Sequence, residues 1–208
     1  MHSPSDELLI KEVRKGRQDA FAEIVRRYQG SVYSLCYRLT GNSAEAEDLA
    51  QESFLRLYKS LGKFRGGGDL RPWLHKITAN VCLDALRKRK DATLPLDETR
   101  EVEGLPKVHA VEELPEDAYL SRESRLDVQK ALLRLPSDYR AALVLRYLED
   151  LSYKEVADAL GVPVSTVETR IFRAKKMLGE IIKSPTAGGK EEASRELHVE
   201  RRTGLSLC

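Results

Sequence analysis

The sequence has few aromatic residues, few cysteines and no long apolar run. Aromatic side chains make up 6% of its 208 residues, with 13 glycines and 8 prolines, too few for a collagen-like or low-complexity chain. Cys36, Cys82 and Cys208 lie far apart and form no CxxC pair, so neither a disulfide framework nor a zinc cluster is expected. No stretch approaches the roughly 20 apolar residues that span a bilayer. Residues 1–7 lack the basic head and apolar segment of a secretory signal. We therefore expect a cytoplasmic protein with no direct membrane insertion.

Charge is abundant and unevenly distributed. The chain is 41% hydrophobic and 33% charged, so a packed core is possible and wholesale disorder is excluded. Residues 1–92 hold 17 basic and 12 acidic side chains, residues 93–121 hold two and eight, and residues 122–183 hold 12 and nine. Two basic blocks around an acidic bridge suggest two anion-binding modules. Two solvated helical surfaces joined by a soluble linker explain the same pattern equally well.

Helical periodicity dominates and predicts an all-α fold of two small helical domains joined by a flexible acidic linker. Helices should begin at Ser3 or Ser5, at Asn42 and at Asp69, with glycines 16 and 41 ending the first two helical stretches. The expected division is a first domain at 1–92, an extended linker at 93–120, a second domain at 121–183 and a polar, flexible tail at 184–208.

The strongest local signal is a helix-turn-helix between Leu151 and Leu178. Ser152 and Glu155 have the spacing of a capping box, and Gly161 permits the left-handed turn that follows. Ser165 and Glu168 have the spacing of a second capping box. A short helix, a glycine-containing turn and a longer helix are typical of a DNA-binding element.

The second of these helices has a distinctive outward face. Its inward side should carry Val167, Ile171, Ala174, Leu178 and Ile181. Its outward side then presents hydroxyls, an exposed aromatic ring and two cations, namely Ser165, Thr169, Phe172, Arg173 and Lys176. These groups suit a helix that enters a major groove. An ordinary helical hairpin with a basic solvated face is the alternative.

A second group of residues lies between Lys63 and Arg89. The predicted helix has one side with Trp73, Leu74, Ile77, Val81 and Ala85, and another with Lys76, Asn80, Leu83 and Arg87. Phe64 and Arg65 begin a glycine-rich loop just before it. Aromatic and cationic groups beside such a loop are what single-strand binding requires.

A third group is an acidic and polar stripe. Asp48, Gln51 and Glu52 have i, i+3 and i+4 spacing, so they share one side of a helix. An acidic stripe repels DNA, so as a binding site it should face a basic protein. A solvated amphipathic helix is the structural alternative.

These motifs, in this order, resemble the bacterial extracytoplasmic-function (ECF) sigma factors of the sigma-70 superfamily. The resemblance rests on the run Asp48–Leu55, the spacing of Trp73, Ile77 and Asn80, and the spacing of Val167, Arg170 and Arg173. It covers about residues 5–183. It implies a sigma factor that binds core RNA polymerase and directs promoter-specific initiation of transcription.

The resemblance also implies roles for individual residues. Asp48, Gln51 and Glu52 would dock on the clamp helices of the polymerase β′ subunit. The first domain, called region 2 in this family, would capture melted −10 DNA with Phe64, Arg65, Lys76, Asn80 and Arg87. The second, region 4, would touch the β flap and bind −35 duplex with Ser165, Thr166, Thr169, Arg170, Phe172, Arg173 and Lys176. The linker would thread toward the polymerase active centre, and an anti-sigma factor would hold the protein inactive.

One residue departs from the family pattern, since Glu168 stands where many members carry a basic residue. It could serve the capping box or accept a hydrogen bond from cytosine. The sequence shows no nucleophile–base pair, phosphate loop or spaced metal ligands, so we expect no enzyme activity, no cofactor and no metal. Two alternatives remain: a stand-alone helix-turn-helix regulator that binds duplex DNA without polymerase, and, more remotely, an enzyme that acts on nucleic acid.

Overall fold

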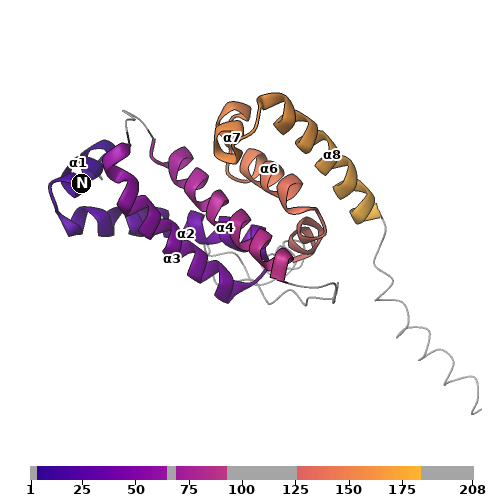
Figure 1. Cartoon of the computed structure of the whole chain (residues 1–208), viewed down its shortest axis with the longest axis horizontal. Coiled ribbons are helices and arrows are strands. Elements are labelled where there is room, and N and C mark those ends of the chain that lie inside the picture. The colour runs from indigo at the N-terminus through magenta and orange to yellow at the C-terminus, as the bar shows by residue number, and fades with distance from the viewer. Residues whose placement is uncertain (1–3, 65–68, 93–125, 184–208) are drawn as a thin grey trace, which may run out of the picture.

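The structure is a computed structural model, and it describes residues 4–64, 69–92 and 126–183. Over these residues it is helical and contains no strand, which confirms the all-α prediction. Figure 1 shows the helices arranged as two neighbouring groups. The N-terminal unit comprises α1 (Asp6–Arg14), α2 (Gln18–Thr40), α3 (Ser43–Ser60), the short 3-10 helix η1 (Leu61–Lys63) and α4 (Arg71–Ala92). The C-terminal unit comprises a helix at 126–133, α6 (Ser137–Tyr147), α7 (Tyr153–Leu160) and α8 (Val164–Lys183). The acidic linker and the tail lie outside the described residues.

Local capping explains where most helices of the N-terminal unit begin. The Ser5 side chain accepts a hydrogen bond from the backbone N–H of Leu8, and Asn42 accepts one from Glu45 at 2.8 Å. Asp69 accepts one from Arg71 at the start of α4. Gly41 ends α2 in the left-handed conformation, with φ 74°. Glycine adopts this conformation at little energetic cost because it has no Cβ. The side-chain caps and this glycine are visible in the sequence, so each of these boundaries could be predicted from it.

The N-terminal unit is built on α2, which packs against α1, α3 and α4. Its core consists of fully or almost fully buried aliphatic side chains from these helices, chiefly Ile24, Val32, Leu35, Leu39, Leu57 and Leu74. Cys36 and Cys82 are both free and completely buried where α2 meets α4. The hydrogen bond with Cys82, followed by burial, raises the pKa of the Cys36 thiol, so this thiol stays protonated.

The C-terminal unit contains the predicted helix-turn-helix. Ser152 and Glu155 form a reciprocal capping box at the start of α7, and Gly161 ends that helix with φ 65°. The inward side of α8 packs as expected, with Val167, Ile171 and Ala174 buried. Leu178 and Ile181 are partly buried against the same core.

The second predicted capping box is wrong. Helix α8 begins at Val164, so Ser165 already lies inside the first turn. The carbonyl of Pro163 accepts hydrogen bonds from the backbone N–H groups of Thr166 and Val167 and so starts the helix earlier. Since Ser165 does not occupy the cap position, Glu168 has no capping role.

The two units pack against one another. Helix α7 packs against α4, while α6 contacts both α2 and α4 (Figure 1). Leu83 shows the consequence: the helical wheel places it on the outward side of α4, yet it is only 3% exposed. It lies opposite Leu74, which faces the N-terminal core, so α4 is covered on two sides.

Candidate nucleic-acid and protein interfaces

The outward face of α8 projects from the body of the molecule. Phe172 is 73% exposed, the largest exposed fraction among the large hydrophobic side chains described. Ser165, Thr169, Arg173 and Lys176 are also exposed, whereas Thr166 is half-buried. A ring, two cations and hydroxyl groups without tertiary cover leave a surface that fits DNA bases and phosphates. Thr169 donates its hydroxyl hydrogen to the Ser165 carbonyl at 2.9 Å, so its oxygen remains an acceptor.

Arg170 lies apart from this face. Its guanidinium is 3.2 Å from the Asp138 carboxylate on α6, and its side chain is only 22% exposed. Arg170 therefore ties the recognition helix to α6 instead of extending outward with Arg173. On the opposite flank, the Lys175 ammonium lies 4.4 Å from the centre of the Tyr147 ring. Both flanking cations thus fix α8 to α6 and leave the central face to the other residues.

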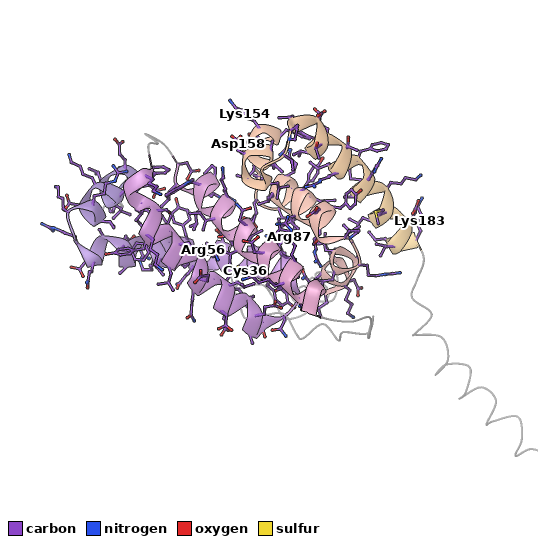
Figure 2. All side chains as sticks on the ribbon, in the orientation of Figure 1. Cys36, Arg56, Arg87, Lys154, Asp158 and Lys183 are labelled. Carbon is purple, nitrogen blue, oxygen red and sulfur yellow. The ribbon has the colours of Figure 1, made fainter. Side chains whose placement is uncertain are left out.

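The predicted outward face of α4 is partly covered. Arg87, labelled in Figure 2, is exposed. It lies 3.4 Å from Asp84 and 3.9 Å from Asp138 of the C-terminal unit. Lys76 and Asn80 are half-buried. The structure therefore gathers these three side chains along one edge of α4, beside the C-terminal unit.

The segment before α4 is held by α1, a feature that the sequence analysis missed. Arg14 donates hydrogen bonds to the carbonyls of Leu61, at 3.0 Å, and Phe64. Asp6 accepts a hydrogen bond from the backbone of Leu70 at 3.3 Å. The Phe64 ring packs against Trp73, with 4.8 Å between the ring centres. Two charged residues of α1 thus fix the chain on either side of residues 65–68. The predicted site residue Arg65 lies outside the described residues.

Asp48, Gln51 and Glu52 share one side of α3 as predicted. Asp48 and Gln51 are exposed, and Glu52 pairs with Arg56 at 2.7 Å. This hydrogen bond lowers the pKa of Glu52. The same side of α3 continues into Leu55 and Tyr58, which are 56% and 48% exposed. Polar groups followed by exposed apolar groups make a surface suited to a protein partner.

The described residues offer no arrangement for metal chemistry. Within 4–64, 69–92 and 126–183, no three His, Cys, Asp or Glu side chains gather as they would around a metal ion. In the same part of the chain, no helix is long and apolar enough to cross a membrane. The prominent features are two helix faces suited to nucleic acid and one suited to protein.

Comparison with known proteins identifies the family in which these helix faces occur. The family model for sigma-70 region 2 matches residues 24–92, and that for sigma-70 region 4 matches residues 125–178. The chain is 42% identical over 172 residues to the ECF RNA polymerase sigma factor SigW of Bacillus subtilis, covering 81% of this chain and 92% of that one.

Two solved structures share the fold at 23% identity. One is CnrH in complex with the cytosolic domain of CnrY, with a TM-score of 0.62 over 87% of this chain and 99% of CnrH. The other is the sigma factor RpoE of Bartonella quintana in complex with the anti-sigma factor NepR, with a TM-score of 0.58 over 80% and 98%.

The fold and its surfaces define a transcription initiation factor with two DNA-binding units. The chain belongs to the ECF group of the sigma-70 family. It is a sigma factor, which binds core RNA polymerase and directs promoter-specific initiation through the −10 and −35 elements. The N-terminal unit contains region 2 and the C-terminal unit contains region 4.

Proposed function

We propose that α3, α4 and α8 divide the work of this sigma factor among polymerase docking, −10 recognition and −35 recognition. The proposed division of the chain is a region 2 domain at 1–92, a linker at 93–120, a region 4 domain at 121–183 and a tail. The observation that carries the proposal is that the matched region 4 exposes the outward face of α8, and the matched region 2 exposes Asp48 and Gln51 on α3.

Polymerase docking is assigned to the side of α3 that carries Asp48, Gln51 and Glu52. These residues would bind the clamp helices of the β′ subunit, with Leu55 and Tyr58 extending the contact as an apolar border. Acidic and amide groups without tertiary cover suit a basic protein partner and disfavour DNA. Region 4 would touch the β flap, which gives the polymerase a second contact.

Recognition of the −10 element is assigned to Phe64, Arg65, Lys76, Asn80 and Arg87. The amide of Asn80 can both donate to and accept from a base edge, and Lys76 and Arg87 can neutralise phosphates. Arg14 and Asp6 are positioning residues in this proposal, because they hold the chain on both sides of the loop.

Recognition of the −35 element is assigned to the outward face of α8. Thr169, Phe172 and Arg173 would contact bases, whereas Ser165, Thr166 and Lys176 would contact the backbone. Arg170 would contribute by holding α8 at its angle on α6, since its guanidinium is engaged by Asp138. Exposed Glu168 has no capping role, so an acceptor role toward cytosine remains.

In this function the chain catalyses no reaction and needs no cofactor. It acts in the cytoplasm, together with its polymerase. An anti-sigma factor is a further proposed partner, because a structural neighbour was solved with one. A stand-alone regulator is not favoured, because such a protein needs no region 2.

Run-off transcription tests the proposal. Purified core polymerase should produce a promoter-specific transcript only when this chain is added. Binding of the chain alone to duplex DNA, with no change in transcription, would instead support the stand-alone regulator.

A further inference from the structure

A cavity of about 300 Å³ lies between α1 and the end of η1. Its lining consists of Glu7, Ile10, Lys11 and Arg14 of α1, together with Phe64, the residue that follows η1. Helix α1 contacts η1 at the end of the N-terminal unit where α3 finishes (Figure 1). The volume is at the lower end of the range for ligand pockets, so the cavity has room for one flat ring with its substituents.

The cavity has an apolar floor and a charged rim. Ile10 is only 3% exposed and Phe64 is half-buried, and both line the cavity with apolar atoms. Glu7 and Lys11 are exposed. Among the described residues, neither of these two side chains forms a hydrogen bond or a salt bridge. A carboxylate and an ammonium group are therefore available to a ligand, and ligand sites commonly combine apolar walls with a few such polar groups.

Arg14 lines the cavity and is held in place by backbone carbonyl groups. Its Nε atom is 3.2 Å from the Leu61 carbonyl oxygen, and one terminal nitrogen donates to the same carbonyl at 3.0 Å and to that of Phe64. An arginine carries five N–H donors, so the other terminal nitrogen can still donate to a ligand. The guanidinium thus provides a positive charge at a fixed place beside Phe64.

Asp6 fixes the N-terminal end of α1. Its carboxylate accepts hydrogen bonds from Arg27 and Tyr28 of α2 and, at 3.3 Å, from the backbone N–H of Leu70. Burial, followed by the hydrogen bond to Asp6, raises the pKa of Tyr28, so the phenol keeps its proton and remains a donor. Helix α1 is therefore anchored at both ends, by Asp6 and by Arg14. A cavity formed in advance needs little further ordering when a ligand binds.

The lining suits an unpaired nucleobase. The flat faces of a base can pack on Phe64 and Ile10. A carboxylate only accepts hydrogen bonds, so Glu7 favours a base with an exocyclic amino group and disfavours thymine, which has none. Lys11 and Arg14 can neutralise the phosphates on either side of that base. The cavity therefore fits one amino-bearing base of a single strand, whose edge is not occupied by pairing.

The cavity also adjoins the surface proposed for the −10 element. Phe64 lines the cavity, and its ring centre is 4.8 Å from that of Trp73 on α4. Since Phe64 and Asn80 are both assigned to melted −10 DNA, a strand that contacts them runs past the mouth of the cavity.

We propose that the cavity is a second subsite for the melted strand, which takes one unpaired base with an exocyclic amino group, next to the base assigned to Asn80. Glu7 accepts a hydrogen bond from the amino group, while Lys11 and Arg14 neutralise the flanking phosphates. This inference rests on the proposed −10 role of Phe64 and Asn80. A segment of the polymerase is the competing occupant, but two cations around one carboxylate favour a polyanion.

Affinity of the holoenzyme for premelted promoters tests the subsite, with each unpaired position of the −10 region varied through all four bases. The wild type should show a preference at one position that Asn80→Ala abolishes, and should disfavour thymine at a second position. Glu7→Gln should reduce the discrimination against thymine at this second position about fivefold or more, because an amide can donate as well as accept. It should leave the Asn80-dependent preference intact.

Two further variants separate base recognition from general attraction. Asp158→Asn is the matched control, since it also removes one acidic charge, from an exposed position on α7 (Figure 2). It should keep both preferences. Lys11→Ala should weaken binding to all the promoters alike and lower the salt slope by about one unit, because a phosphate contact carries no sequence information. Glu7 and Lys11 are exposed, so their variants should keep the helicity of the wild type.

A wild type with no second position that disfavours thymine, or unchanged discrimination in Glu7→Gln, would overturn the subsite. Weaker binding of Glu7→Gln to core polymerase in the absence of DNA would identify the polymerase as the occupant and would overturn it as well. In each of these cases the Asn80-dependent preference would still support the proposed −10 role. A wild-type holoenzyme that is indifferent to every unpaired base would instead contradict that role, and the subsite with it.

Discussion

Asp138 on α6 binds the guanidinium of Arg170 on α8 at 3.2 Å, across the hairpin that carries the recognition helix. Arg170 is 22% and Asp138 is 40% exposed, so solvent weakens the pair without abolishing it. A double-mutant cycle with Arg170→Ala and Asp138→Asn should yield a coupling free energy of unfolding between a few tenths and about 1 kcal/mol.

The same substitution separates positioning from base reading. Arg170→Ala should weaken binding to all −35 variants alike, because it loosens the attachment of α8 to α6. Urea denaturation and binding to a small set of −35 duplexes are the measurements. A changed base preference with unchanged stability would show that Arg170 reads DNA directly.

A second prediction concerns polymerase docking through α3. The double variant Asp48→Lys, Gln51→Ala should bind core polymerase about 2 kcal/mol more weakly, or roughly thirtyfold, because truncation at the centre of an interface has effects of this size. Helicity should not change, since both side chains are exposed. Lys59→Ala, exposed further along α3, is the control. Equal core affinity for the variant and the wild type would exclude this docking surface.

A third prediction concerns Asn80 on α4. If Asn80 holds an unstacked base, Asn80→Ala should slow strand opening more than it weakens the closed complex. Permanganate footprinting on a duplex promoter measures this opening. A promoter premelted across its −10 element should restore part of the defect but not the lost base recognition. Normal opening by the variant would remove Asn80 from the proposed site.

Local features of the fold were predictable from the sequence, and long-range polar contacts were not. Ser5, Asn42 and Ser152 cap their helices because a cap involves residues only three positions apart. The capping box predicted at Ser165 and Glu168 was wrong, because the Pro163 carbonyl accepts the first backbone hydrogen bonds and α8 begins before Ser165. The spacing of Ser165 and Glu168 does not show where these bonds begin.

The candidate sites were predictable to the extent that helix periodicity separates the faces. Arg173 and Lys176 are exposed as predicted, because their positions follow from the buried stripe of α8. The contact between Arg38 and Glu149 joins residues 111 positions apart, and neither residue has a local pattern that identifies the other. Burial of Leu83 could not be predicted for the same reason, since it depends on how the two units pack.

A fourth prediction concerns pH and His75. Burial, followed by the charges of Arg71 and Arg38, lowers the pKa of His75 from 6.5 to about 4. The unfolded chain therefore binds this proton at higher pH than the folded chain, so stability should fall as the pH drops from about 6.5 toward 4. The loss is at most about 3 kcal/mol.

His75→Gln should flatten the dependence of the free energy of unfolding on pH within this window. Burial raises the pKa of Glu149, which acts in the opposite direction and remains in both proteins. Urea denaturation at several pH values gives the comparison. Identical slopes for the variant and the wild type would show that His75 does not titrate in this window.

The central claim is that the outward face of α8 reads the −35 element, and Arg173 and Lys176 test it most directly. An arginine–base contact contributes about 1–3 kcal/mol of discrimination, whereas a phosphate contact contributes attraction that salt screens. The measurement is holoenzyme affinity across a small −35 library at several salt concentrations. Arg173→Ala should flatten the preference among the variants, and Lys176→Ala should weaken all of them alike and lower the salt slope by about one unit. Full sequence preference in Arg173→Ala, with only a lower overall affinity, would contradict the assignment.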